Sequence, residues 1–164
     1  MKLNKDKKIF FVSMALLSSV GMSAADQFVS FQKGDLLINR DNKVEIYMDA
    51  NDCKGVSYAA NALVKDIIKV SGSKAILTSD AGLKDKDAAG KPTILVGTIG
   101  HSAAIDQLIR QKRINGNLLK GKREKFIITV VDGQLVIAGS DRRGTIYGIY
   151  ELSQQMGVSP WYDW

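Results

Sequence analysis

Hydrophobic side chains change their spacing several times in this chain, and each spacing predicts a different secondary structure. Between residues 56 and 68, apolar positions recur every three or four residues, which predicts a helix with one buried face, and Gly72 predicts its end. Apolar and other residues alternate over residues 44–48, which predicts a strand. Shorter apolar runs predict three further strands, at residues 28–31, 36–39 and 75–78.

The second half of the chain repeats this change of spacing. Residues 93–97 form a continuous apolar run, which predicts a strand covered on both faces, and residues 102–113 have the spacing of a second helix. Asp132 and Gly133 separate two β-rich runs, at 126–131 and 134–138. Both residues tolerate a positive φ, so they predict a hairpin with a two-residue turn.

A third helix is predicted after this hairpin, over residues 141–157. Asp141 is the predicted N-terminal cap, and Gly157 with Pro160 predicts the end. We expect its buried stripe to contain Ile146, Ile149, Tyr150 and Met156. The elements together predict an α/β fold of the two-layer α+β kind, in which about three helices pack mainly on one face of a mixed sheet.

The first 25 residues have the features of a secretory signal peptide. Four lysines lie within the first eight residues, an apolar run covers 9–20, and small residues at 23–25 predict cleavage near Ala25. The apolar run is shorter than the roughly 20 residues of a membrane-spanning helix. We therefore expect a secreted or periplasmic protein with no membrane span after cleavage.

Charge gives little indication of a nucleic-acid partner. Removal of residues 1–25 takes away four lysines and one aspartate, so the formal charge of +6 falls to +3. Two clusters of cations remain, and neither is interleaved with aromatic residues, so we expect solvated charge and no nucleic-acid binding. The clusters are Arg110, Lys112 and Arg113, and Lys120, Lys122, Arg123 and Lys125.

The sequence contains few residues or motifs suited to thiol, metal or phosphate chemistry. Cys53 is the single cysteine and His101 the single histidine, so no intrachain disulfide forms, and no pattern indicates a Cys/His pair, a zinc site or a cofactor. Residues 97–101 join a strand to a helix, as in nucleotide-binding proteins. They lack the three-glycine fingerprint and the phosphate-loop lysine, so we expect a plain turn with His101 or Ser102 as cap.

The carboxylates near the third helix do not form a catalytic pair. Asp132 is explained by the turn, Asp141 by the cap and Glu151 by a solvated helix surface, whereas Asp163 is unexplained. Acid/base hydrolysis needs two groups with different pKa values across one site. We therefore predict no catalytic residue in this chain.

Aromatic residues gather near the end of the chain, and two interpretations are open. Tyr147, Tyr150 and the aromatic residues of 161–164 could stack on sugar rings, or they could fill a seam between domains. Gly144 and Gly148 favour the seam, because two glycines four residues apart allow a partner to come close. The candidate residues for interdomain docking are Arg142, Arg143, Gly144, Gly148, Trp161 and Trp164.

The last third of the chain, between Lys125 and Tyr162, contains the strand FIITVV, the run LVIAGSDRRGTIYGIYELS and the motif GVSPWY. In these motifs the chain resembles the N-terminal domain of glycoside hydrolase family 115, the xylan α-1,2-glucuronidases. A strand followed by Arg-Gly and a tyrosine-bearing helix is also similar to the small domain before the barrel in families 20 and 67. The resemblance implies a mixed sheet with helices on one face.

The resemblance further implies a secreted or periplasmic enzyme that removes glucuronic or 4-O-methylglucuronic acid from xylan. It places the catalytic acid and base on a following (β/α)8 barrel, which would be the partner of this domain. Together with the signal peptide predicted at 1–25, it implies an accessory domain at 26–158 and the start of a linker at 159–164. Xylan-type polysaccharide is the expected ligand, and a free-standing secreted carbohydrate-binding module is the alternative.

Overall fold

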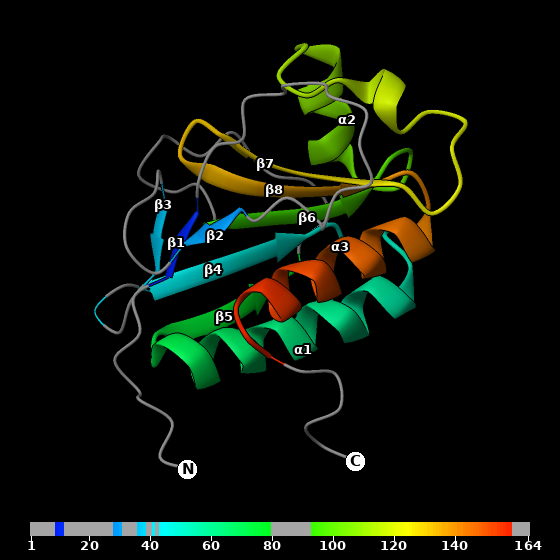
Figure 1. Ribbon diagram of the computed structural model, residues 1–164. Helices are drawn as coiled ribbons and strands as arrows, with labels where there is room; N and C mark the ends of the chain where they lie inside the picture. Colours follow the sequence, from blue (N-terminus) through cyan, green and yellow to red (C-terminus); the bar gives the residue numbers. More distant parts are fainter. Residues whose placement is uncertain are drawn as a thin grey trace, which may run out of the picture.

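A five-stranded mixed sheet forms the centre of the computed structural model, which describes residues 9–11, 28–30, 36–38, 41, 43–79 and 93–158. The strand order is β5-β4-β6-β8-β7 (Figure 1). Only β7 runs antiparallel, to β8, and the other pairings are parallel. The strands are β4 (Lys43–Met48), β5 (Lys74–Thr78), β6 (Ile94–Thr98), β7 (Phe126–Val131) and β8 (Gln134–Gly139).

Three α-helices cover this sheet, and they confirm the predicted fold class. They are α1 (Lys54–Ser71), α2 (Ala103–Arg110) and α3 (Arg142–Gln155), with a short 3-10 helix at Gly116–Leu118. Figure 1 shows α1 and α3 side by side on one face and α2 on the other. Alternate residues of β6 face the two layers: Ile94 and Val96 pack with α1 and α3, and Leu95 packs with α2. The predicted coverage of β6 on both faces is confirmed.

Local sequence explains where α1 ends and where α2 begins. Gly72 closes α1 with φ 71, and its N–H donates to the carbonyl of Ile68. This left-handed conformation is the usual reason for a glycine after a helix. Ser102 caps α2, because its hydroxyl accepts from the N–H of Ile105, so the serine and not His101 is the cap.

The predicted hairpin is also confirmed. Asp132 and Gly133 have φ 50 and 76, and they join β7 to β8 in a register that pairs Val131 with Gln134. Two consecutive positive φ values twist the chain in the direction that adjacent strands require. The β8 strand is fully buried, and it leads the chain directly into α3.

A second, three-stranded sheet involves the N-terminal part of the chain. Its order is β2-β1-β3, with both pairings antiparallel, and it consists of β1 (Ile9–Phe11), β2 (Val29–Ser30) and β3 (Leu36–Ile38). The β1 strand lies inside the predicted signal peptide. Trp161 and Trp164 lie outside the described residues. Among the residues described, no helix is both long and apolar enough to span a bilayer.

Candidate functional site

The start of α3 is fixed by the Asp141 side chain, as predicted. One carboxylate oxygen accepts from the N–H of Gly144 at 2.8 Å, and the other accepts from the N–H of Glu124 at 2.8 Å. These two bonds favour the charged form, so the hydrogen bond from Glu124, followed by that from Gly144, lowers the pKa of Asp141. Asp141 therefore joins the helix to the segment that precedes β7.

The two glycines of α3 contact their own domain, which corrects the expectation that they face a partner. A Cβ built on Gly144 would lie 2.2 Å from the carbonyl oxygen of Lys125. A Cβ on Gly148 would lie 2.8 Å from the Ile137 side chain and 3.3 Å from that of Phe126. The spacing of the glycines does allow a close approach, but the approaching groups belong to the β7–β8 hairpin.

The two arginines at the start of α3 have different surroundings. Arg143 pairs with Glu124 at 2.9 Å, and its guanidinium donates to the hydroxyl of Tyr147 at 2.7 Å. The bond to Tyr147, and then the charge of Glu124, raise the pKa of Arg143. Arg142 extends over the first turn of α1, where its side chain lies near Gly55, and it has no ion pair with a described residue.

An open pocket of about 380 Å³ lies beside these arginines, at the end of the sheet where β6 and β8 finish. Its lining contains Arg142, Arg143, Cys53 and His101, together with Thr98, Ile99, Ser140 and Asp141. The structure thus brings the cysteine and the histidine to one pocket, which the sequence did not indicate. No hydrogen bond joins the two side chains, which is a poor arrangement for thiol activation.

Two buried aspartates beside this pocket were missed in the sequence. The carboxylate of Asp52 accepts from the N–H groups of Thr98 and Cys53, at 2.7 Å each. Asp49 accepts from the N–H of Ala103 at 3.1 Å, in the first turn of α2. Free N–H groups at a helix start would otherwise attract an external anion. The available signal was the position of both residues in the short connection that follows a mostly buried strand, with Asp49 directly after the strand.

The tyrosines of α3 are exposed, which corrects the expectation that Tyr150 belongs to the buried stripe. Tyr147 is 39% and Tyr150 52% exposed, whereas Ile149 and Met156 are buried as predicted. Tyr58 on the neighbouring α1 is 75% exposed. The α1–α3 layer therefore exposes three aromatic side chains, of which Tyr147 contacts Arg143.

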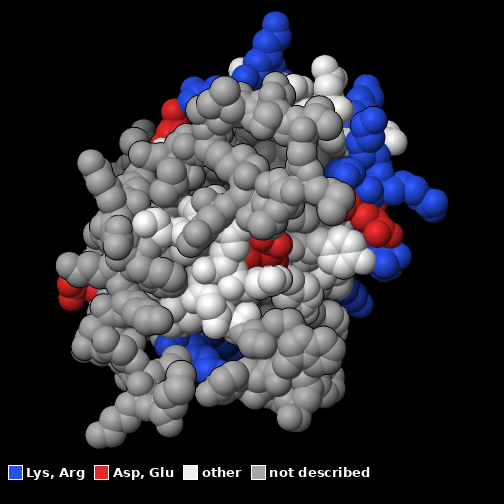
Figure 2. All heavy atoms as spheres, in the orientation of Figure 1, with Lys and Arg blue, Asp and Glu red and all other residues white. Residues whose placement is uncertain are grey.

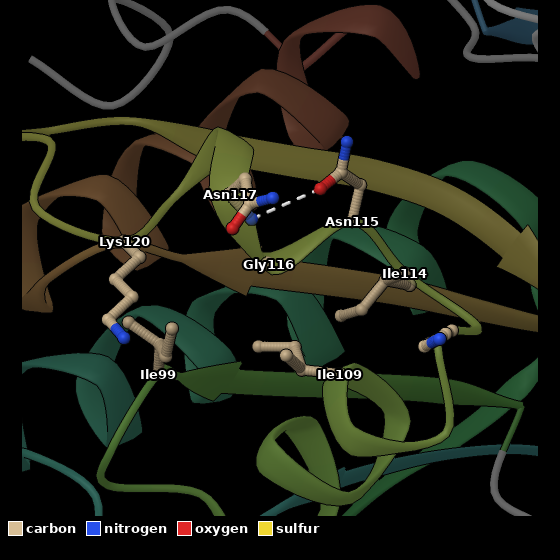
Figure 3. Close-up of a pocket in the computed structure, with 8 residues that line it drawn as sticks. Ile99, Ile109, Ile114, Asn115, Gly116, Asn117 and Lys120 are labelled. Atoms are coloured by element: carbon tan, nitrogen blue, oxygen red, sulfur yellow. Dashed lines mark hydrogen bonds between the residues drawn. The ribbon is translucent and has the colours of Figure 1, made fainter.

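A second pocket, which we call the lysine pocket, lies on the opposite layer of the molecule. It has a volume of about 500 Å³ and is lined by Ile99, Ile109, Lys112, Ile114, Asn115, Gly116, Asn117 and Lys120. Figure 3 shows Ile99, Ile109 and Ile114 side by side, with Asn115 and Asn117 on the other side of the opening and Lys120 extending toward Ile99. Gly116 is required there, because a Cβ would lie 2.6 Å from Ile109.

Comparisons with known proteins place this domain in a family. The family model described as the N-terminus of glycosyl hydrolase family 67 matches residues 39–152. A solved structure described as a family GH115 4-O-methyl-α-glucuronidase with specificity for decorated arabinogalactans has 34% sequence identity and a TM-score of 0.64. The match covers 79% of this chain and 15% of that chain. No curated protein matches. The resemblance found in the sequence is confirmed, and the chain belongs to the family of N-terminal domains of family 67 and family 115 type α-glucuronidases.

Proposed function

We propose that this chain is the non-catalytic N-terminal domain of a secreted enzyme that removes glucuronic or 4-O-methylglucuronic acid from xylan-type polysaccharide. Family membership supports the link to α-glucuronidases. The chain spans 15% of the length of the family 115 relative, so hydrolysis would be performed by a catalytic barrel elsewhere in the enzyme. The proposed role of the domain is to support that barrel.

The hydrogen bonds made by the carboxylates near the pocket of Arg142 and Arg143 are the observation that favours a non-catalytic role most strongly. Asp49, Asp52 and Asp141 each accept hydrogen bonds from backbone N–H groups. Glycoside hydrolysis usually needs two carboxyl groups directed at one sugar, about 5–5.5 Å apart in retaining enzymes and about 6.5–9.5 Å apart in inverting ones. Their oxygen atoms are directed at backbone N–H groups of this domain, which favours a structural role for all three.

The exposed side of α3 is the surface we propose for docking to the barrel. Arg143, Tyr147 and Tyr150 follow one another at intervals of four and three residues, so they form one row on the helix. Interfaces are enriched in Tyr and Arg. Arg142 extends this row toward α1, and Trp161 and Trp164 are proposed to contribute from beyond α3.

The non-catalytic proposal is tested by incubating the purified chain with glucuronoxylan and measuring released glucuronic acid. We expect no release, and any release that scales with protein concentration overturns the proposal. Tryptophan fluorescence during titration with neutral xylan oligosaccharides tests the alternative, a free-standing carbohydrate-binding module. A saturable change would favour that module over a docking role for the aromatic residues.

Secretion is part of the same proposal, and it has a structural consequence. The lysines before residue 9 and the small residues at 23–25 support cleavage near Ala25. Cleavage would remove β1, which is the strand that pairs with both β2 and β3. N-terminal sequencing of the exported protein tests this, and a first residue before 20 would contradict it.

A further inference from the structure

Positive charge is concentrated in one stretch of the chain, residues 110–125, which we call the basic segment. It contains seven cations and one carboxylate, so its net charge of +6 equals that of the whole chain. All seven cations are exposed. Arg113 pairs with Asp132, and the other six make no ion pair with a described residue. Figure 2 shows Lys and Arg side chains along the top and right margins, where α2 and the following segment lie in Figure 1.

Most of the residues that line the lysine pocket belong to this segment, and the lining combines three kinds of group. Ile99, Ile109 and Ile114 form an apolar wall, and Lys112 and Lys120 supply two ammonium groups. Asn115 and Asn117 add amides, which both donate and accept hydrogen bonds. A volume of about 500 Å³ falls within the range of about 300–1,000 Å³ that is usual for small-ligand pockets.

This lining fits a charged sugar better than a nucleic acid. A pyranose ring has an apolar C–H face, hydroxyl groups for the amides and, in a uronic acid, a carboxylate for the lysines. Single-stranded nucleic acids usually bind through bases stacked on aromatic side chains, and the lining contains none.

The backbone at Lys112 gives a second reason to assign a binding role. Lys112 follows α2 with φ 57, and its N–H donates to the carbonyl of Ile109. Glycine is the favoured residue in this left-handed position, because a side chain there is strained. A lysine at this position lowers stability relative to glycine, and its side chain lines the lysine pocket.

We propose that the lysine pocket and the basic segment bind the uronic-acid groups of an acidic polysaccharide. The choice of polymer rests on the proposed function, whereas the existence of an anion-binding surface rests on the charges described above. The domain would hold an acidic chain near the enzyme through sugars that are not being hydrolysed.

The first experiment compares ligands that differ only in charge. The full chain is titrated with 4-O-methylglucuronoxylan, with the same polymer after its carboxyl groups have been reduced to alcohols, and with a single-stranded oligonucleotide. We expect saturable binding of the native polymer that weakens with added salt and is at least about tenfold weaker after reduction. Equal binding of native and reduced polymer, absence of binding, or tighter binding of the oligonucleotide overturns the proposal.

The second experiment uses matched variants. Lys112→Gln with Lys120→Gln removes two charges from the lysine pocket, and Lys54→Gln with Lys65→Gln removes two exposed charges from α1 on the other layer. We expect the first pair to weaken binding by about threefold to thirtyfold, since an exposed ion pair contributes up to about fivefold in affinity. The second pair of substitutions should change the affinity for glucuronoxylan less than twofold. Equal losses in the two variants would show a non-specific response to net charge.

Lys112→Gly separates binding from a structural role. Glycine relieves the strain at this position, so the urea midpoint should rise or stay unchanged while binding of glucuronoxylan weakens. Unchanged binding by Lys112→Gly overturns the assignment of this residue. Glucuronic acid release, measured on the same samples, reports on the non-catalytic proposal alone, so the two proposals can fail independently.

Discussion

The contact between Gly144 and Lys125, the residue just before β7, gives the sharpest test of how this domain is held together. Gly→Ala in a helix normally stabilises a protein by up to about 1 kcal/mol, because alanine has the higher helix propensity. At Gly144 the new methyl group would lie 2.2 Å from the carbonyl oxygen of Lys125 and 3.0 Å from its carbonyl carbon. Backbone atoms cannot rotate away, so α3 and β7 must separate.

The expected cost follows from what that separation disturbs. The carbonyl oxygen of Lys125 accepts from the N–H of Ser140 at 2.8 Å, and such a bond contributes about 1 kcal/mol. Overpacking adds about 1–3 kcal/mol. After subtraction of the gain in helix propensity, we expect Gly144→Ala to lower the free energy of unfolding by about 1–3 kcal/mol.

Gly55 provides a matched control, because it also lies in the first turn of a helix. Its Cβ would lie 3.4 Å from Ile146 and 3.5 Å from Arg142, both of which are ordinary contacts with side chains. Gly55→Ala should therefore be neutral or stabilise by up to about 1 kcal/mol. Gly148→Ala should be intermediate, since it meets the side chains of Ile137 and Phe126, which can shift.

Urea unfolding at neutral pH, with midpoint and slope fitted for each variant, measures these differences. The expected order of stability is Gly55→Ala, wild type, Gly148→Ala, Gly144→Ala. Wild-type stability in Gly144→Ala would refute the argument, because the glycine would then have no role in packing. In the complete enzyme the loss should be the same size, since the contact lies within the domain.

Three further predictions concern the hydrogen bonds of the same region. The pKa of Asp141 is lowered in the folded state, so its charge contributes stability at pH values above its unfolded pKa near 3.8, and this contribution is lost as the pH falls through the lower folded value. Asp141→Asn keeps a cap but should show a flatter decline in thermal stability over this acid range. Parallel declines for the variant and the wild type would contradict the assignment. The buried hydroxyls of Thr98 and Thr145 lie 2.8 Å apart, and the Thr145 hydroxyl also donates toward the carbonyl of Asp141. Thr145→Val should lower the free energy of unfolding, measured with urea, by about 1–3 kcal/mol. The loss should exceed that of Thr98→Val, because in that variant the Thr145 hydroxyl can still donate to the carbonyl of Asp141. Asp52→Ala removes the acceptor of two backbone N–H groups and should lower the free energy of unfolding by about 2–3 kcal/mol at neutral pH. A loss below about 0.5 kcal/mol would indicate that water takes the place of the carboxylate.

The predictable parts of the fold are those specified by residues close in sequence. The spacing over 56–68 is enough to define α1, because the buried face of a helix repeats within a few residues. Asp132 and Gly133 define the hairpin through their own conformations, and Asp141 caps α3 through an N–H three residues away. Each prediction depends on an interaction within one element or one turn.

The unpredicted parts depend on contacts between distant segments. The partners of Gly144 were assigned to another domain because the sequence does not show that Lys125 comes within contact distance. Tyr150 has a spacing compatible with the buried stripe, but α1 covers only part of α3 and leaves this side chain exposed. The pocket that contains Cys53 and His101 forms because β4 and β6 are neighbours in the sheet, although the first strand ends at Met48 and the second begins only at Ile94.

The two layers of the domain provide separate surfaces for the two proposed partners. The aromatic row with Tyr147 and Tyr150 belongs to the α1–α3 layer, and the lysine pocket lies with α2 on the other face of the sheet. The five strands between them are joined by parallel and antiparallel pairing into one continuous sheet, which separates the two surfaces. A polysaccharide bound at the lysine pocket would therefore leave the proposed docking surface accessible, and docking to a barrel should not change the affinity for glucuronoxylan.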